Sequence, residues 1–352
     1  MTDSQTQATL LISVAEAEDF ARRLLAAVGA RDGDAAVTAE NLIFADRSGI
    51  ASHGLLRLPL YAEAAHRGGI NTAPAMTWLR QGPGGGLLDA DGAFGQAAMN
   101  EAVRFAAEEM ARSASAVVSV QNSVHFGAGA FWVDKLARQG YFGLITSTTG
   151  PVVTPFGGSG RVLGTNPLAI AMPTAERHSM TMDMATSTGA YGKVVAARQT
   201  GATIPEGWGV DAQGSPTTDP QSALDGALTA FGGHKGSSLS VAIEALSAAL
   251  GHAAYAHETV DIWADPASRM NVGHTLIAIN PDFFGGIDHS RTRCSQLRRT
   301  IRASGENVFA PGDIEAAHRD GRAEHMELSS STLELLHQAA ERWQVPKLRV
   351  VN

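Results

Sequence analysis

Apolar residues recur every three or four positions near the start of the chain, which is the spacing of a helix with one buried face. Phe20, Leu24 and Val28 follow this spacing. Ser13 and Glu16 stand ahead of them in the order of a capping box, in which two side chains satisfy free backbone N–H groups at a helix start. The segment is therefore predicted to be an amphipathic helix that begins near Ser13.

Helical spacing continues beyond this segment and returns near the C-terminal end. One helix is expected after Asp34, and another through LLRLPLYAEAAHRGG (residues 55–69), where Pro59 falls early and Gly68 ends the pattern. The stretch SSSTLELLHQAAERWQVP (329–346) indicates a capped helix that stops at its proline. Both ends of the chain are thus predicted to be helical.

The middle of the chain alternates between two patterns. Short apolar runs predict the strands SAVVSV (115–120), YFGLITST (141–148), PLAIAMP (167–173), MTMDMA (180–185) and HTLIAIN (274–280). Helical spacing predicts GQAAMNEAVRFAAEEMARS (95–113), AFWVDKLARQ (130–139) and SSLSVAIEALSAALG (237–251). This alternation indicates an α/β or α+β domain with strands covered by helices. Residues 186–236 are dense in Gly, Pro, Thr and Asp and are expected to form a long functional or disordered loop.

Composition narrows the function classes. The 352 residues carry a formal net charge of −8, whereas proteins that bind nucleic acids or anionic membranes in general need a basic surface. Cys294 is the one cysteine, which excludes an intramolecular disulfide framework and a zinc site built on cysteines. The N-terminal residues lack the pattern of a signal peptide, and no apolar run has the length of a membrane span. We therefore expect a soluble, cytoplasmic protein.

Glycine clusters are the first candidates for chemistry. The run GGSGRVLG (157–164) resembles part of a dinucleotide-binding fingerprint, but in that fingerprint the glycines lead into a helix whose N–H groups hold the pyrophosphate. Here the run leads to Thr165-Asn166-Pro167 and then a strand. A standard Rossmann site is therefore not expected.

The segment NSVHFGAGAF (122–131) fits ligand binding better. It runs from a strand through a glycine corner into a helix, an arrangement in which backbone N–H groups point toward an anion. Gly127 and Gly129 would let a ligand approach the backbone closely. His125 would stand beside it, and an imidazole exchanges protons near neutral pH. The alternative is that His125 is an ordinary polar residue with satisfied hydrogen bonds.

Two further segments place charged groups near turns. In ASHGLLRLP (51–59), His53 and Arg57 share a face if the segment is helical, and an arginine grips a carboxylate with two parallel hydrogen bonds. In MTMDMATS (180–187), Asp183 ends a strand and is placed to receive ribose hydroxyls. The alternatives are a solvated arginine and an aspartate that caps the following turn.

A lysine stands at a glycine-rich helix start in GGHKGSSLS (232–240). His234 and Lys235 suit a phosphate or a carboxamide, and the alternative is an exposed polar turn. The residues that could in principle bind a metal are His53, His125, His234 and Asp183. These residues lack the His-x-x-x-His or His-x-His spacing of common sites, so no metal is expected.

Six ordered motifs carry a family resemblance: SHGLLRLPLY, NSVHFGAGAF, PFGGSGRVLGTNPLAIAMP, MDMATSTGAYGK, IPEGWGVDAQGSPTTDP and GGHKG. Together they resemble the malate/L-lactate dehydrogenase family of NAD(P)-dependent oxidoreductases, which is distinct from the Rossmann-fold lactate and malate dehydrogenases. Its members include ureidoglycolate, sulfolactate and diketogulonate dehydrogenases and reductases of cyclic imino acids.

The resemblance implies a fold. A non-Rossmann nicotinamide-binding α/β domain with a mixed sheet covered by helices would span residues 76–304. A helical domain assembled from residues 1–75 and 305–352 would contribute substrate contacts. The resemblance also implies a homodimer and either NAD or NADP as the cofactor.

The resemblance further implies roles for single residues. His125 would move the proton, while Ser52, His53 and Arg57 would face a small carboxylate substrate, with His53 and Arg57 also catalytic. The residues expected to contact the dinucleotide are Phe126, Gly127, Thr149, Asp183, Met184, Ala185, His234, Lys235, Pro311, Gly312 and Asp313. At the last of these positions the family has glutamate, so Asp313 departs from its pattern.

These roles predict one reaction and leave alternatives. His125 would take the proton from a 2-hydroxyl group while a hydride passes from C2 to C4 of the nicotinamide, with Arg57 holding the carboxylate. Reduction of a cyclic or N-substituted 2-imino acid is the alternative within the family, because C=O and C=N are both planar centres beside a carboxylate. Alternatives from other classes are a metal-dependent hydrolase or lyase and an inactive binding protein.

Overall fold

The computed structural model describes residues 9–351, and a seven-stranded mixed sheet forms its centre. Every neighbouring pair is antiparallel except β3 and β4, which run parallel. The strands, in spatial order, are β2 (Thr77–Gly82), β3 (Gly85–Asp89), β4 (Ser115–Ser123), β11 (Val272–Ile279), β5 (Phe142–Ser147), β6 (Leu168–Met172) and β7 (Met180–Met184). The predicted α/β fold with a mixed sheet is confirmed.

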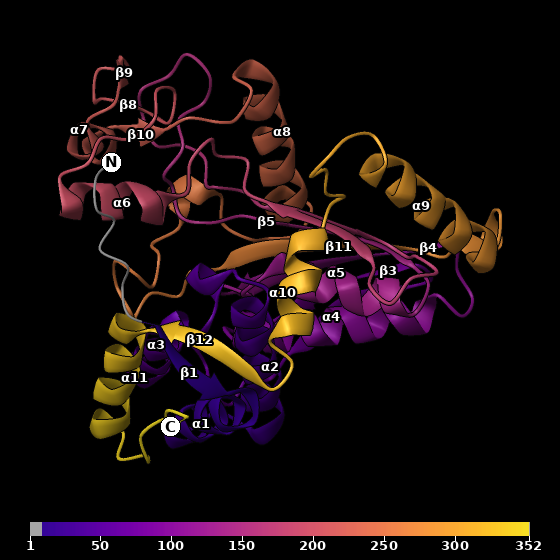
Figure 1. The fold of residues 1–352 in the computed structure, drawn as a ribbon, viewed down its shortest axis with the longest axis horizontal. Coiled ribbons are helices and arrows are strands. Elements are labelled where there is room, and N and C mark those ends of the chain that lie inside the picture. The colour runs from indigo at the N-terminus through magenta and orange to yellow at the C-terminus, as the bar shows by residue number, and fades with distance from the viewer. Residues whose placement is uncertain (1–8, 352) are drawn as a thin grey trace.

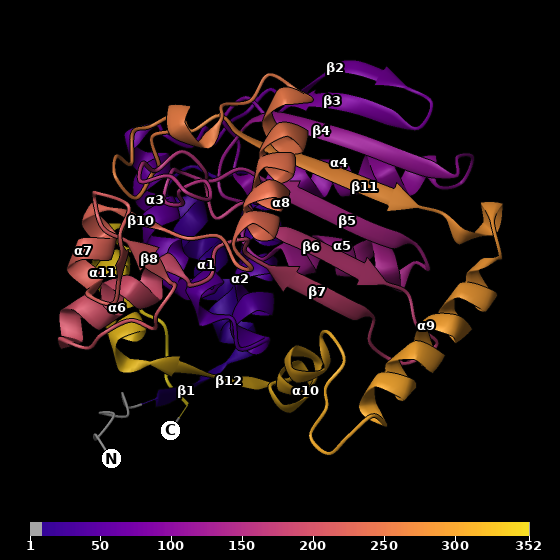
Figure 2. The same ribbon diagram turned by 90° about the horizontal axis from the view of Figure 1, so that it is seen from above.

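Helices cover the two faces of this sheet unequally (Figure 2). Helices α4 (Gly95–Glu109) and α5 (Gly129–Arg138) lie along one face, where Trp132 and Phe94 are fully buried. On the other face lies α8 (His234–Glu244), which continues as a π-helix through Ala245–Ala249. Helix α9 (Ile287–Arg302) follows β11 and extends along the end of the sheet (Figures 1 and 2).

Segments near the two ends of the described chain, residues 9–13 and 325–329, come together beside the sheet (Figure 1). Strand β1 (Thr9–Ser13) pairs antiparallel with β12 (His325–Ser329), so that Leu11 faces Glu327. Around this pair lie α1 (Val14–Ala27), α2 (Asp32–Arg47), α3 (Leu58–Arg67), α10 (Asp313–Gly321) and α11 (Ser330–Arg342). One hydrophobic core joins α1, α2, α3 and α11 to α4, α5 and the sheet. The domain boundaries near residues 75 and 305 stay a prediction.

A small unit packs around a second hydrophobic core. It contains the three-stranded sheet β10–β8–β9 (Ala227–Leu228, Gly209–Val210 and Pro216–Thr217) with α6 (Tyr191–Thr200) and α7 (Pro220–Asp225). The prediction that residues 186–236 form one long loop is therefore wrong. Its elements are short, and Val194 is the one buried residue of α6, so the segment has little hydrophobic periodicity.

Several local predictions can be compared with the structure. Pro59 lies in the first turn of α3, and Gly68 ends that helix in the left-handed conformation (φ 84°), as predicted. The capping box at Ser13 is wrong, because the Ser13 side chain makes no capping hydrogen bond and Glu16 pairs with Arg23 and Arg349. No helix in the described part of the chain has the length and hydrophobicity that crossing a bilayer requires.

Candidate active site

The corner after β4 is fixed by a close contact with α2. Gly127 has φ 79°, and a Cβ there would lie 1.7 Å from Oδ1 of the buried Asn41, so any other residue would strain the backbone and displace Asn41. Asn41 hydrogen-bonds both the N–H and the carbonyl of Ala128, at 3.3 Å each. The corner and the start of α5 are thereby held in one conformation.

His125 projects from this corner, and hydrogen bonds hold one side of its ring. The Tyr61 hydroxyl lies 2.5 Å from Nδ1, and the Gly127 nitrogen lies 3.3 Å from the same atom. The buried Gln96 donates to the Tyr61 oxygen at 3.3 Å. Burial raises the pKa of Tyr61 to about 12, so its phenol stays protonated at neutral pH. These contacts orient the half-buried imidazole and leave Nε2 as its other polar atom.

His53 and Arg57 lie beside His125, although not in the single helix considered from the sequence. Residues Ala51–His53 and Leu55–Arg57 form two short 3-10 turns on either side of Gly54. A Cβ at Gly54 would lie 2.0 Å from Oδ1 of Asp46, whose carboxylate accepts the Leu55 N–H at 2.7 Å. The ring centres of His53 and His125 are 5.4 Å apart.

Burial and positive neighbours keep both imidazoles neutral. Desolvation lowers the pKa of His53 to about 4, and Arg57 adds to the effect. The pKa of His125 also lies well below 6.5, chiefly through desolvation and then through His53 and Arg57. Arg57 is therefore the charged member of this group at neutral pH. Its Nε donates to the Ser52 carbonyl at 2.6 Å, and the Ser52 hydroxyl lies 3.0 Å from Nδ1 of His53.

The loop before β11 adds two residues that the sequence interpretation missed. The guanidinium of Arg57 lies 4.7 Å above the Trp263 ring, and that ring meets His125 edge-on at 5.3 Å. Asp261 accepts the Trp263 N–H at 3.1 Å. Desolvation raises the pKa of Asp261 to about 6, against a smaller opposing effect of Arg57. Nothing local in the sequence marks these two residues, since they lie more than 130 positions from His125.

The sequence interpretation also missed Tyr61 and Gln96, although the spacing of Tyr61 in the sequence could have indicated it. Tyr61 stands four residues after Arg57, the spacing at which side chains on a helix are neighbours. Its full burial beside a histidine is a property of the fold. Gln96 lies in the first turn of α4, where no pattern distinguishes it from a surface glutamine.

Asp183 lies at the end of β7, the edge strand next to the start of α5. Its carboxylate accepts the Ala130 N–H at 2.8 Å, and a Cβ at Gly129 would lie 3.2 Å from its Oδ1. The side chain keeps solvent contact, yet the surrounding protein desolvates it enough to raise its pKa to about 6. An exposed carboxylate beside glycine backbone suits the paired hydroxyls of a ribose, so this part of the site fits a dinucleotide.

The other residues expected at the cofactor are distributed along neighbouring elements. Thr149 follows β5, and its hydroxyl accepts the Thr165 N–H at 2.8 Å. Met184 pairs with Leu168 in β6, and the exposed Ala185 follows it. His234 and Lys235 form the first turn of α8, with the His234 ring 6.0 Å from Phe156. Phe126 is buried and packs edge-on against His274 at 4.7 Å, so its ring faces the core.

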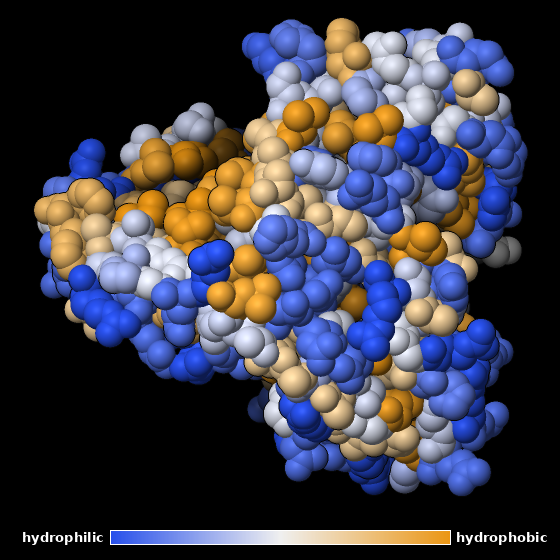
Figure 3. Space-filling model, turned by 180° about the vertical axis from the view of Figure 1, so that it is seen from behind, coloured by the Kyte–Doolittle hydropathy of each residue, from blue (hydrophilic) through white to orange (hydrophobic). Residues whose placement is uncertain are grey.

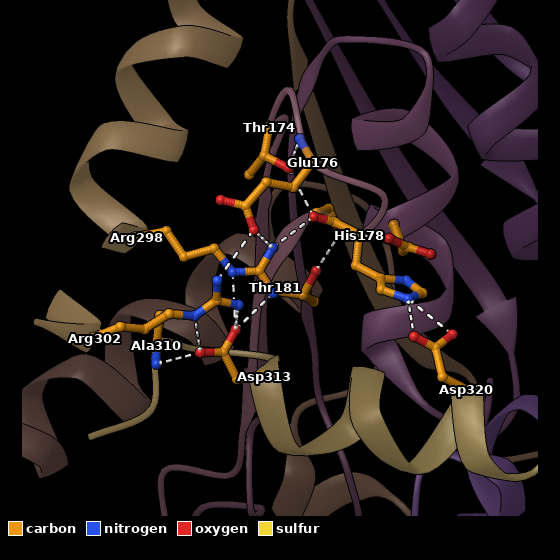
Figure 4. Close-up of polar contacts among 11 residues, drawn as sticks. Thr174, Glu176, His178, Thr181, Arg298, Arg302, Ala310, Asp313 and Asp320 are labelled. Carbon is orange, nitrogen blue, oxygen red and sulfur yellow. Dashed lines mark hydrogen bonds and ion pairs between the residues drawn. The ribbon is translucent and has the colours of Figure 1, made fainter. Parts of the chain in front are cut away.

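Pro311 and Gly312 lie at the free edge of β7, where the Pro311 carbonyl accepts the Thr181 N–H at 3.2 Å. Figure 4 shows Asp313 between Arg298 and Arg302. Both of its oxygens accept hydrogen bonds, at 2.6–2.8 Å, from these arginines and from the Ala310 N–H. Burial alone would raise the pKa of Asp313, but these bonds hold it far below its usual range. The Asp313 carboxylate therefore has its principal partners within the protein.

Histidines and carboxylates do not gather elsewhere in the described residues as a metal site would require. Within residues 9–351 there is no group of three His, Cys, Asp or Glu side chains arranged to hold an ion. The run at 157–160 forms turns that lead to an isolated bridge between Leu163 and Val153, and the next regular element is β6. The prediction that this run is not a Rossmann fingerprint is confirmed.

Comparison with known proteins agrees with this geometry. A family model described as malate/L-lactate dehydrogenase matches residues 12–337. The L-sulfolactate dehydrogenase of Methanocaldococcus jannaschii is 35% identical over 86% of this chain and 88% of its own. The NAD(+)-dependent ureidoglycolate dehydrogenase of Escherichia coli K12 is 36% identical, with the same two shares.

Solved structures give the same result at the level of the fold. The sulfolactate dehydrogenase from M. jannaschii matches with a TM-score of 0.89 at 32% identity, over 96% of this chain and 98% of its own. The delta1-piperideine-2-carboxylate reductase from Pseudomonas syringae pvar. tomato matches with a TM-score of 0.86 at 32% identity, over 94% and 99%. The chain belongs to the malate/L-lactate dehydrogenase family.

Proposed function

We propose that the protein is an NAD(P)-dependent oxidoreductase that interconverts a small 2-hydroxy acid and its 2-oxo acid by hydride transfer. The observation that carries this proposal is the arrangement of a neutral, oriented imidazole at His125 beside a single guanidinium at Arg57. A general base and a carboxylate anchor are the two groups that oxidation of a 2-hydroxy acid requires from the protein. Sulfolactate and ureidoglycolate, named in the related dehydrogenases, are both acids of this kind.

Arg57 would hold the substrate carboxylate. One of its nitrogens is committed to the Ser52 carbonyl, and the face of the guanidinium lies against Trp263. Its remaining N–H groups are left to form the paired hydrogen bonds that fit a carboxylate. Ser52 and His53 would border the same group, with His53 acting as a neutral donor because its pKa is lowered to about 4. A substrate held in this way presents C2 and its oxygen to His125.

His125 would accept the proton of the 2-hydroxyl at Nε2, in the neutral tautomer that carries its own proton on Nδ1. The lowered pKa keeps the imidazole neutral at pH 7, which is the form needed for oxidation. In this tautomer the Nδ1–H donates to the Tyr61 oxygen, which lies 2.5 Å away, so the ring does not turn away from the substrate. A positioned base of this kind contributes on the order of 10²–10⁴ in rate.

The dinucleotide would lie along the free end of β7. When bound, its nicotinamide accepts the hydride from C2 of the hydroxy acid. Asp183 would receive ribose hydroxyls, and the glycine corner at Phe126-Gly127 would border the ring. The remaining contacts that we propose are Thr149, Met184, Ala185, His234, Lys235, Pro311, Gly312 and Asp313. Asp313 would contribute through its place in the ion-pair cluster, since its carboxylate is already paired.

Reduction of a cyclic or N-substituted 2-imino acid is the second candidate function. The similarity to delta1-piperideine-2-carboxylate reductase, across nearly all of both chains, supports it. The same residues serve either reaction, because Arg57 would hold the carboxylate beside C=N as it does beside C=O. His125 would donate the proton in that reaction, as it would in reduction of a 2-oxo acid. The similarity to the named 2-hydroxy acid dehydrogenases is what places oxidation of a hydroxy acid first.

A homodimer is the assembly that we propose. Five side chains form an apolar row across the sheet and stay partly exposed on the face that α8 leaves open: Val117, Ile277, Leu144, Ile170 and Met182. Figure 3 shows hydrophobic side chains in the hollow between α8 and α9. A second copy of the chain would remove this surface from water. We also propose that the protein is cytoplasmic, and its net charge of −8 argues against a nucleic-acid or anionic-membrane partner.

The proposed function is tested by dinucleotide binding followed by a substrate screen. We expect NADH or NADPH fluorescence to change on titration in the presence of a chelator. We then expect NAD(P)H formation with at least one acid from a panel of 2-hydroxy acids. Absence of binding by both dinucleotides would contradict the proposed function. Activity that is lost with the chelator and independent of dinucleotide would indicate a metal-dependent enzyme instead.

A further inference from the structure

The loop from Thr259 to Asn271 carries a short segment, Asp261-Ile262-Trp263, into the candidate site. Ile262 is fully buried in the main hydrophobic core, so its neighbours on either side are fixed in place. The loop is also held against the end of α3, because a Cβ at Gly69 would lie 2.2 Å from the Pro266 carbonyl. The positions of Asp261 and Trp263 are therefore built into the fold.

Asp261 gives the site a negative charge next to its positive one. Its Oδ1 accepts the Trp263 N–H at 3.1 Å, and its Oδ2 lies 3.0 Å from the place of a Cβ on Gly150. Arg57 lies near enough to favour the ionised carboxyl of Asp261, but Arg57 is engaged by the Ser52 carbonyl and the Trp263 ring. Asp261 thus lies close to Arg57, which would anchor the substrate, but it does not completely neutralise the charge of Arg57.

The charges of the site determine which chemical groups it can accept at the end of the substrate distal to the carboxylate. His53 and His125 are neutral at neutral pH, so Arg57 is the cation of this cluster. Once the substrate carboxylate pairs with Arg57, the nearby charge of Asp261 would be left without a compensating cation. A second anionic group there would meet a like charge, whereas an N–H, O–H or ammonium group would donate a hydrogen bond to it.

We propose that Asp261 selects 2-hydroxy acids whose distal end is a hydrogen-bond donor, such as an amide, ureido, hydroxyl or ammonium group, and disfavours a second carboxylate or a sulfonate. This proposal rests on the proposed function, since it names the substrate class of the same site. A substrate with a donor at its distal end gains a hydrogen bond to the charged carboxylate, whereas an anionic substrate is repelled. This difference changes the relative affinity of the two substrates by about tenfold to a hundredfold.

The experiment compares two substrates of nearly equal size and shape: malate, and its 4-amide, 4-amino-2-hydroxy-4-oxobutanoate. We expect kcat/KM for the amide to exceed that for malate at least tenfold with the preferred dinucleotide. Asp261→Asn keeps an oxygen to accept the Trp263 N–H but removes the charge. It is expected to lower the amide-to-malate ratio at least tenfold while the dinucleotide dissociation constant stays the same.

Asp265 provides a matched control in the same loop. Its Oδ1 accepts the Ala267 N–H at 3.0 Å, the same kind of turn contact as in Asp261, but its side chain is exposed. Asp265→Asn is expected to leave the amide-to-malate ratio unchanged. If Asp261→Asn does not fold, Asp261→Ser serves the same comparison.

The outcomes separate this inference from the proposed function. If neither acid is turned over, binding of the same pair to the enzyme–dinucleotide complex gives the ratio. The inference is overturned if the wild type binds or uses malate as well as the amide. It is also overturned if Asp261→Asn leaves the amide-to-malate ratio unchanged, or if neither acid binds. Failure of the enzyme to bind any dinucleotide overturns the proposed function itself.

Discussion

Each of three residues has a separate role in the candidate site: His125, Tyr61 and Arg57. Tyr61 is fully buried and holds Nδ1 of His125, while Arg57 supplies the positive charge that the two neutral histidines do not. Each depends on its surroundings for its ionisation state, because desolvation acts on all three in the direction of the neutral form. Substitutions at this scale should therefore affect ligands before they affect stability.

Arg57→Lys should weaken the substrate much more than the cofactor. Lysine keeps the charge but loses the planar fork that pairs with a carboxylate. Loss of part of such a charge-assisted pair costs about 1.5–3 kcal/mol, which is about tenfold to a hundredfold in KM. Steady-state kinetics with the best hydroxy acid and a separate NADH titration check this. An unchanged KM would remove Arg57 from the substrate site.

Residue types and their spacing predicted part of this site. His125, His53 and Arg57 were found because a histidine at a glycine corner and an arginine near a turn have recognisable chemistry, and the structure brings them together. Asp261, Trp263 and Gln96 were not found. They reach the site through the packing of the loop before β11 and of α4, which no local pattern encodes.

At the scale of elements, strong hydrophobic periodicity predicted helices and strands correctly, but the sequence did not predict which distant segments pair. The predicted strands and helices of the sheet are present because each buries a regular set of apolar residues. The pairing of β1 with β12 joins residues more than 300 positions apart, and helix α9 buries just Ser295 and Arg298. The apolar run of β1 does not reveal its distant partner, and α9 buries too few apolar residues to be recognised, so neither was predicted.

Gly127→Ala tests the corner between β4 and α5. The added methyl group meets Asn41, and the backbone there has a positive φ. We expect a loss of about 1–3 kcal/mol in the free energy of unfolding, measured by chemical denaturation. Gly160→Ala is the control, since a Cβ there meets nothing within 4 Å. Equal stability of the two variants would show that the corner is not constrained.

His274 makes the central strand β11 sensitive to acid. Its buried ring lies 2.9 Å from both Ser147 Oγ on β5 and Ser123 Oγ on β4. Desolvation lowers its pKa to about 3, so between pH 6.5 and 3 the unfolded chain binds a proton that the folded chain does not. The contribution of His274 to the free energy of unfolding is therefore fully present above pH 6.5. It falls by about 1.4 kcal/mol for each pH unit below that.

Denaturation of His274→Gln across this pH range checks the effect. The variant should be less stable than the wild type at pH 7, because glutamine fits these two hydroxyls less well. Its stability should then decline less steeply between pH 6.5 and 4. Parallel curves for the two proteins would mean that His274 is protonated in the folded state, contrary to its burial.

At the scale of the whole molecule, the open face of the sheet is the surface on which we propose that a second copy of the chain packs. Ile277 lies in the middle of the apolar row on this face, between Val117 and Leu144. We expect Ile277→Lys to convert a dimer into monomers, measured by sedimentation velocity at several concentrations. Leu335→Lys, an exposed apolar position on α11, should leave the assembly unchanged. A monomeric wild type, or a dimeric Ile277→Lys, would contradict the proposed interface.

His125→Asn tests the central claim most directly. Asparagine cannot carry the proton, but the glycine corner and the Asp183 carboxylate remain, so dinucleotide binding should be retained. We expect kcat for oxidation to fall by on the order of 10²–10⁴. The wild-type rate should stay constant as the pH falls through 6.5 and decline only in more acid solution, because the pKa of His125 is lowered. A folded His125→Asn protein that binds NADH normally and keeps most of its kcat would contradict the account.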